Sequence, residues 1–249
     1  MIPYLEQPHL TLGGWTFYPF GFFVGLASLA GAWLLIRRAS RELDAAIATK
    51  LTLYMIGWGY LGSHVTYLLL FDQARLYAHP WILLNPNDGI YSFGGIVSGL
   101  LTVALLSRRY GLSRQATLRY VDHTAYVFPT AWAIARTGCS LAHDHPGLPS
   151  TSWLAVRFPA GPRFDLGLIE LLFTLGMVGL WRFFDHRPRP APFFVGLFFL
   201  LYGPFRIWLD QLRDPPSIAD RTFGLISIVC GAAALVFAAH EASKASSGT

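Results

Sequence analysis

The stretch from Pro192 to Arg213, PFFVGLFFLLYGPFRIWLDQLR, is long and apolar, yet it carries an arginine, Arg206, well inside the run. The hydrocarbon core of a bilayer is about 30 Å thick, and an α-helix needs about 20 apolar residues to cross it. We therefore predict that this stretch is a transmembrane helix. A charge inside such a helix is costly unless it faces a cavity or the interior of a bundle, so Arg206 is a candidate functional residue.

Similar apolar runs fill most of the chain. Of its 249 residues, 53% are hydrophobic and only 13% are charged, which excludes an ordinary water-soluble globular protein. Because little sequence remains between the runs, we expect one all-α integral membrane domain over residues 1–249, a polytopic bundle of about seven transmembrane helices. The predicted spans are 17–36, 47–71, 89–107, 120–141, 165–184, 192–212 and 222–240.

The basic residues predict the orientation of the bundle. Of the 19 Lys and Arg residues, twelve lie after the first, third and fifth spans or in the C-terminal tail. Loops rich in Lys and Arg stay in the cytoplasm, so we expect an outside N-terminus and a cytoplasmic C-terminus. This distribution explains the high pI without a nucleic-acid partner. The twelve residues are Arg37, Arg38, Arg41, Lys50, Arg108, Arg109, Arg114, Arg119, Arg182, Arg187, Arg189 and Lys244.

In this orientation, polar side chains from several spans lie in the outer half of the membrane. The fourth span ends there in RTGCSLAHDHPG, residues 136–147. The second, fifth and sixth spans carry polar residues at the same depth. Intramembrane polar groups usually face a cavity, so we predict a functional cavity at the outer leaflet. The candidate substrate-binding residues are His64, Tyr202, Glu170, Asp165 and Arg163.

The candidate catalytic residues are two arginines and the HDH sequence. Arg136 and Arg206 suit a lipid phosphate, because a guanidinium group is always charged and binds phosphate oxygens in a bidentate manner. His143 or His145 could act as a general base, because the pKa of histidine lies near working pH. If the segment is extended, both histidines point to one side, and Asp144 would orient the base.

Other interpretations of the HDH sequence stay open. His143 and His145 could bind a metal, with His64 or Asp165 completing the ligand set, but a single His-x-His pair is a weak metal signal. We therefore predict no cofactor. The histidines could also lie in a solvated loop that contacts only lipid headgroups. The sequence contains no H-E-x-x-H or G-x-S-x-G motif, so the zinc-protease and serine-hydrolase interpretations lack their signatures.

The order of the motifs resembles that of the bacterial prolipoprotein diacylglyceryl transferase family. The similar segments are WLLIRRASR (33–41), SFGGIVSGL (92–100), ARTGC (135–139) with the later Gly147, HRPRP (186–190) and GLFFLLYGPFRIWLDQLR (196–213). The last is similar to the family's Tyr-Gly-x-x-Arg segment. By this resemblance, Arg136 and Arg206 stand at the positions of two essential arginines. Tyr202 and Glu170 stand at those of a tyrosine and a glutamate.

The resemblance implies a function at the outer leaflet of the bacterial cytoplasmic (inner) membrane. In the family reaction, phosphatidylglycerol donates its diacylglyceryl group to a cysteine thiol of a lipoprotein precursor and releases glycerol phosphate. Arg136 and Arg206 would then hold the phosphate and stabilise its leaving charge. The implied partners are a phosphoglycerolipid donor, phosphatidylglycerol, and a lipoprotein precursor or another nucleophilic acceptor.

The chain also departs from the family pattern. Phe93 replaces a histidine before the paired glycines of the third span, Cys139 replaces an asparagine, and His64 replaces an arginine. A more polar run is reduced to FDLGLIE, residues 164–170. We expect the fold and the lipid substrate to be retained. Two alternatives stay open, namely a related enzyme with a different acceptor and a non-catalytic protein that binds or transports lipid.

Overall fold

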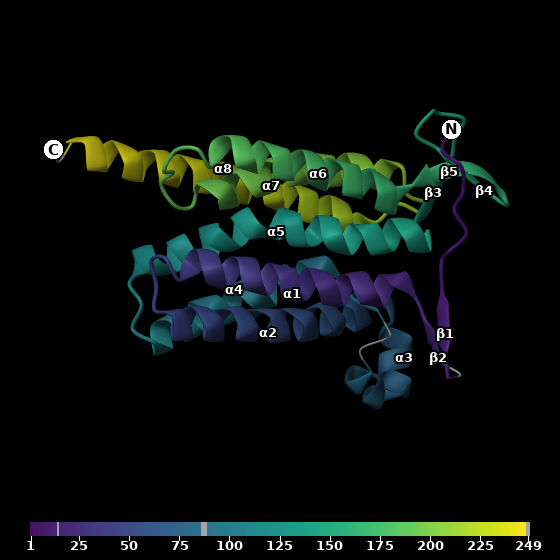
Figure 1. Cartoon of the computed structure of the whole chain (residues 1–249), viewed down its shortest axis with the longest axis horizontal. Helices are drawn as coiled ribbons and strands as arrows, with labels where there is room; N and C mark the ends of the chain where they lie inside the picture. Colours follow the sequence, from purple (N-terminus) through teal and green to yellow (C-terminus); the bar gives the residue numbers. More distant parts are fainter. Residues whose placement is uncertain (14, 86–88, 248–249) are drawn as a thin grey trace. The chain divides into compact units, whose positions relative to one another are not determined.

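The long helices of the protein lie where the hydropathy predicts spans. The computed structural model describes residues 1–13, 15–85 and 89–247. Two short helical segments, α3 (Gln73–Ala78) and η1 (Pro80–Leu84), follow the second long helix. The expectation of a mostly helical protein is confirmed (Figure 1). The long helices are α1 (Pro19–Ala39), α2 (Ala45–Phe71), α4 (Ser92–Arg109), α5 (Arg114–Ala142), α6 (Leu166–Phe184), α7 (Phe193–Gln211) and α8 (Ile218–Ser247).

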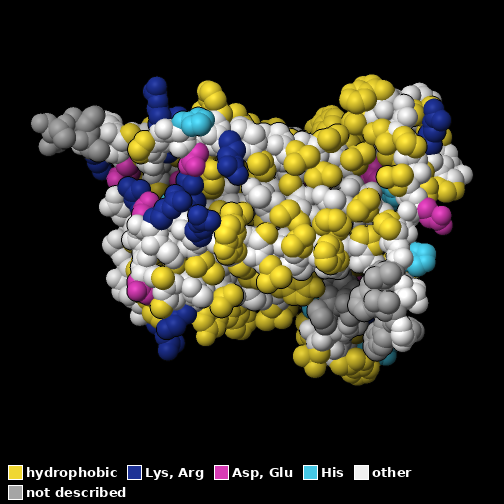
Figure 2. All heavy atoms as spheres, viewed as in Figure 1, with side chains coloured by type: hydrophobic (Ala, Val, Ile, Leu, Met, Phe, Trp, Pro, Cys, Tyr) yellow, Lys and Arg dark blue, Asp and Glu magenta, His cyan; other side chains and the backbone are white. Residues whose placement is uncertain are grey.

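The surface of these helices suits a lipid environment. Within the described residues, four helical stretches are long and apolar enough to cross a membrane: 19–39, 166–184, 193–211 and 218–244. Large apolar side chains are exposed on them, including Val229 and Val236 of α8 at 70% and 71%. Figure 2 shows hydrophobic side chains over much of the helical surface. Contiguous apolar surface of this kind is unfavourable in water and favourable in lipid.

The chain divides into two compact units. One contains residues 1–31 and 124–249, and the other contains residues 32–123. In the second unit, α2 and α4 approach closely at glycines. A Cβ atom on Gly94 would lie 2.5 Å from the carbonyl oxygen of Gly62, so a larger residue would force the two helices apart.

Glycines also set the packing of α7 against α8 in the first unit. A Cβ atom on Gly203 would lie 2.7 Å from the carbonyl oxygen of Gly224. This close approach holds Arg206, which follows Gly203 on α7, near the start of α8. At the same end of the unit, Leu166 and Leu209 belong to a buried apolar cluster that joins α6 to α7.

Short strands correct the all-α prediction. β3 (Pro146–Pro149), β4 (Val156–Phe158) and β5 (Gly161–Asp165) form an antiparallel sheet in the order β3-β5-β4. β1 (Leu10–Leu12) and β2 (Trp15–Phe17) form a separate two-stranded sheet. These segments lie mostly outside the apolar runs, and prolines and glycines in β3 and β5 disfavour helix there.

The N-terminal segment is attached to the three-stranded sheet. The amide of Ile2 donates to the carbonyl oxygen of Ala155 at 2.8 Å, and the amide of Arg157 donates to that of Ile2 at 3.0 Å. The sheet lies beside the end of α5 and the start of α6, at the end of the first unit shown on the right of Figure 1. This arrangement gathers the end of α5, the sheet and the N-terminal segment in one place.

Candidate functional site

Glu170 is the centre of a buried polar cluster in the first unit. It lies on α6, and its side chain is 3% exposed. Arg136 Nη2, from α5, lies 2.8 Å from Glu170 Oε2, and Arg206 Nη1, from α7, lies 3.8 Å from the same oxygen. The Tyr202 hydroxyl donates a hydrogen bond of 2.9 Å to Glu170 Oε1. The structure therefore brings four predicted site residues together: three side chains contact the carboxylate of the fourth, Glu170.

Helix periodicity and aromatic packing position these groups. Tyr202 and Arg206 are four residues apart on α7, so they share one face of the helix. Trp132 lies one turn before Arg136 on α5, and the Arg136 guanidinium sits 5.4 Å from the centre of its ring. The Trp132 and Tyr202 rings are 5.6 Å apart. The arginine is thus held by an aromatic ring as well as by the carboxylate.

Asp220 extends the cluster to the start of α8. Its carboxylate lies 2.8 Å from Arg206 Nη2 and 3.5 Å from Arg213 Nη2. Asp220 is not among the site residues predicted from the sequence. Ser217 and Asp220 follow the S-x-x-D spacing of a helix N-terminus, which could have marked the helix start. That spacing would not have shown that Asp220 turns inward.

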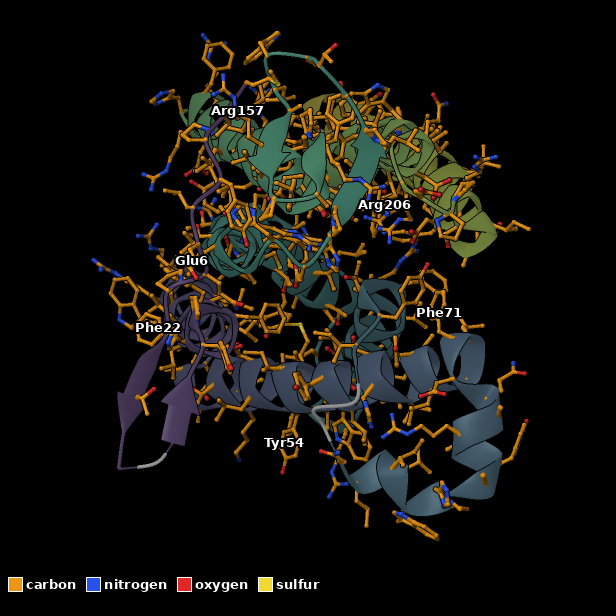
Figure 3. All side chains as sticks on the ribbon, turned by 90° about the vertical axis from the view of Figure 1, so that its right-hand side faces the viewer. Glu6, Phe22, Tyr54, Phe71, Arg157 and Arg206 are labelled. Carbon is orange, nitrogen blue, oxygen red and sulfur yellow. The ribbon has the colours of Figure 1, made fainter. Side chains whose placement is uncertain are left out.

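The charges of this cluster are paired in the interior. The side chains of Arg136 and Arg206 are 13% and 11% exposed, and buried charges are tolerated only when they are paired and hydrogen-bonded. In Figure 3, Arg206 lies among the helices, whereas Arg157 of β4 lies at the margin of the unit. A guanidinium group has five N–H donors, so each arginine can hold its carboxylate and still donate to another anion. The cluster is chemically suited to a phosphate.

His143, a predicted candidate base, lies against Asp165 and the N-terminal segment. It directly follows α5 and has φ +51°, so the HDH segment is not extended at His143. Its Nδ1 lies 2.5 Å from Asp165 Oδ2 rather than against Asp144, and its Nε2 lies 3.0 Å from the Leu5 carbonyl oxygen. Both ring nitrogens of His143 are thus occupied by contacts within the protein. His143 links the N-terminal segment to the start of α6, and its ring stacks on the ring of Tyr4.

His145 lies in another group, with Cys139 and Asp144. One ligand atom from each of these three side chains lies within 4.8 Å of the others. His145 Nε2 is 3.9 Å from Asp144 Oδ1, and Arg136 Nη1 is 3.4 Å from Cys139 Sγ. Burial raises the pKa of the Asp144 carboxyl and lowers the pKa of His145. Arg136 therefore contacts both the Glu170 cluster and this second group.

Three other predicted residues support local structure. Asp165 caps α6 by accepting from the Leu168 amide at 3.0 Å, in addition to its contact with His143. Arg163 Nε donates to the carbonyl oxygen of Gly147 at 2.8 Å, which ties β5 to β3. His64 belongs to the other unit, where its ring nitrogens lie 2.8 and 3.1 Å from the carbonyl oxygens of Gly89 and Ile82.

Comparison with known proteins identifies the family. A family model described as prolipoprotein diacylglyceryl transferase matches residues 8–240. A phosphatidylglycerol–prolipoprotein diacylglyceryl transferase from Nitratidesulfovibrio vulgaris (strain DP4) is 29% identical over 222 residues, covering 86% of this chain and 83% of the relative. A protein of the same name from Chromohalobacter salexigens is 30% identical over 222 residues, covering 86% and 81%.

A third relative of that name, from Pseudomonas aeruginosa strain PAO1, is 27% identical over 226 residues, covering 86% of this chain and 83% of the relative. The matches extend over the helices that carry Arg136, Glu170 and Arg206. The expected family and the expectation of an enzyme are confirmed. The chain belongs to the prolipoprotein diacylglyceryl transferase family of membrane enzymes.

Proposed function

We propose that this protein transfers the diacylglyceryl group of a phosphoglycerolipid, phosphatidylglycerol, to an acceptor thiol at the outer leaflet of the bacterial cytoplasmic membrane. The observation that carries the proposal is the convergence of Arg136 and Arg206 on Glu170 among apolar helices. The names of the relatives support the donor and the prolipoprotein acceptor.

The two arginines would bind the phosphate of the donor. When the bond between glycerol carbon and phosphate oxygen breaks, the phosphodiester becomes a phosphomonoester and gains one negative charge. Guanidinium donors fixed in advance stabilise such a developing charge without reorganising. Glu170 would hold Arg136 and Arg206 in place, Tyr202 would hold Glu170, and Asp220 would orient Arg206 from α8.

The acceptor thiol would be activated as a nucleophile at His145. His145 belongs to the group of Cys139, whose Sγ contacts Arg136, whereas the ring nitrogens of His143 lie against Asp165 and the Leu5 carbonyl oxygen. Asp165 and Arg163 would contribute by holding the sheet next to the site. His64 stays a candidate substrate-binding residue within its own unit.

The proposed topology has seven spans in one transmembrane domain. α2, α4 and α5 would cross the membrane together with the four more apolar helices. The N-terminus and the segment between α5 and α6 would face outward, and the C-terminus would face the cytoplasm. The support is the concentration of Lys and Arg in alternate connections.

A reconstituted assay tests the proposed function. The purified protein is placed in vesicles of phosphatidylglycerol with a lipoprotein-precursor peptide that contains one cysteine, and mass spectrometry follows the peptide. We expect a diacylglyceryl thioether and glycerol phosphate in equal amounts. Lipid consumed without peptide modification would indicate another acceptor. Lipid bound but not consumed would indicate a binding or transport protein, and either result would refute the proposal as stated.

A further inference from the structure

Cys139, Asp144 and His145 form a group of three metal-ligand side chains of different types. Their ligand atoms lie within 4.8 Å of one another. Zinc binds sulfur at about 2.3 Å and nitrogen or oxygen at about 2.0–2.2 Å, so tetrahedral ligands are roughly 3.5 Å apart. Rotation of the side chains that moves each ligand atom by about 1 Å would bring the three atoms to that spacing. The side chain of Asp144 is 34% exposed, so the group is open on one side.

The backbone around this group is anchored at both ends. The amide of His143 donates to the carbonyl oxygen of Cys139 at 2.9 Å, which closes the last turn of α5. The left-handed conformation of His143 then turns the chain back, so Asp144 and His145 lie beside the turn that carries Cys139. The carbonyl oxygen of His145 accepts from the Leu166 amide at 3.0 Å. The ligands are therefore held before any ion binds.

The charge of the group also suits a dication. A thiolate and a carboxylate supply two negative charges, and a neutral imidazole completes a three-ligand set of the kind found in catalytic zinc sites. Arg136 lies 3.4 Å from Cys139 Sγ, but its own charge is balanced by Glu170 at 2.8 Å. A bound dication would thus leave no net excess of positive charge in the interior.

We propose that Cys139, Asp144 and His145 bind a zinc ion whose fourth position receives the acceptor thiol. The role of the fourth position rests on the proposed function. Zinc deprotonates a coordinated thiol, and the proton would pass to water at the open side. The thiolate sulfur would attack the glycerol carbon of the donor, forming the carbon–sulfur bond as the carbon–oxygen bond to phosphate breaks. The electron pair of that bond would leave with glycerol phosphate.

Arg136 places the two halves of this reaction side by side. One of its nitrogens contacts Cys139 and another contacts Glu170, between the two arginines proposed to bind phosphate. A thiolate on the zinc and a phosphate on the arginines would therefore lie next to each other. Holding the two reactants next to each other makes their reaction effectively unimolecular.

Metal binding is tested first, without reference to activity. The purified protein is stripped with a chelator, exposed to zinc, desalted and analysed for metal content. We expect about one zinc per chain, and Cys139→Ser, Asp144→Asn or His145→Ala should weaken binding by about 10²-fold or more. Cys230→Ser and His240→Ala, which alter a cysteine and a histidine on α8, are the matched controls and should bind zinc like the original protein.

Cobalt provides a second measurement on the unaltered protein. Cobalt bound through Cys139 should show a sulfur-to-cobalt charge-transfer absorption, which Cys139→Ser should lack and Cys230→Ser should keep. Absence of zinc and of this absorption from the unaltered protein overturns the site. Equal binding by all the variants also overturns it.

Activity then separates this inference from the proposed function. If the metal-free protein transfers diacylglyceryl at the full rate, the inference is wrong and the proposed function stands. If zinc binds to these three residues but no lipid is transferred under any condition, the metal site stands and the proposed function fails. Loss of transfer on chelation and its return with zinc would support both.

Discussion

Arg136 and Arg206, 70 residues apart in the chain, contact the same oxygen atom of Glu170. Because both guanidinium groups contact this oxygen, its position constrains the positions of both. Because α5 and α7 each carry only one of the arginines, the spacing between them depends on α6, which carries Glu170. This dependence makes Glu170 the residue that positions both arginines of the proposed phosphate site, and it can be tested.

Replacing Glu170 with Gln should destabilise the protein and lower its activity. The change keeps the size of the side chain but leaves two buried guanidinium groups with one carboxylate fewer, which costs about 3–5 kcal/mol. Thermal unfolding in detergent measures the stability. Glu241→Gln is the matched control, because its exposed ion pair with Lys244 should contribute no more than about 1 kcal/mol. Equal stability of the two variants would contradict the central role of Glu170.

Lysine should not substitute for either arginine. Arg136→Lys and Arg206→Lys keep the positive charge but lose the planar fork, so we expect lipid turnover to fall by about 10- to 100-fold in each. Arg157→Lys, at the margin of the unit, should retain full turnover (Figure 3). Turnover is measured as glycerol phosphate released from phosphatidylglycerol. Full activity in both Arg136→Lys and Arg206→Lys would mean that these arginines do not bind the phosphate in a bidentate manner.

The two histidines of the HDH sequence should respond differently to alanine. His145→Ala should reduce turnover by about 10²–10⁴-fold while lipid binding stays nearly intact, because an activating group is lost. His143→Ala removes the contacts with Asp165 and Leu5, so we expect faster hydrogen exchange in residues 2–5. Kinetics and exchange measured on both variants check the distinction. The reverse pattern would show that His143 is the activating histidine.

The orientation of the chain can be read by chemical labelling. In a protein with Cys139→Ser and Cys230→Ser, a cysteine placed at Ser150 should react with a membrane-impermeant maleimide in intact cells. A cysteine at Ser113 should react only after the membrane is opened, because the short segment between α4 and α5, flanked by Arg109 and Arg114, is expected in the cytoplasm. Labelling of Ser113→Cys but not Ser150→Cys in intact cells would invert the proposed topology.

The sequence by itself determined the helices and the residue types of the site. Hydropathy sums over many residues, so the apolar run around Arg206 predicts a helix whatever its neighbours are. The same runs marked Arg136 and Glu170 as charges that must face the interior, because lipid does not tolerate them unpaired. The family resemblance rested on the same segments.

Only the tertiary structure decided which side chains meet. Asp220 joins Arg206 because glycines let α8 approach α7 closely, and no local pattern encodes that distance. His143 and His145 look equivalent in the sequence, yet the left-handed turn at His143 sends one ring to Asp165 and the other toward Cys139. A single backbone angle reverses the direction of a side chain, and the packing that stabilises this angle comes from residues far away in the chain.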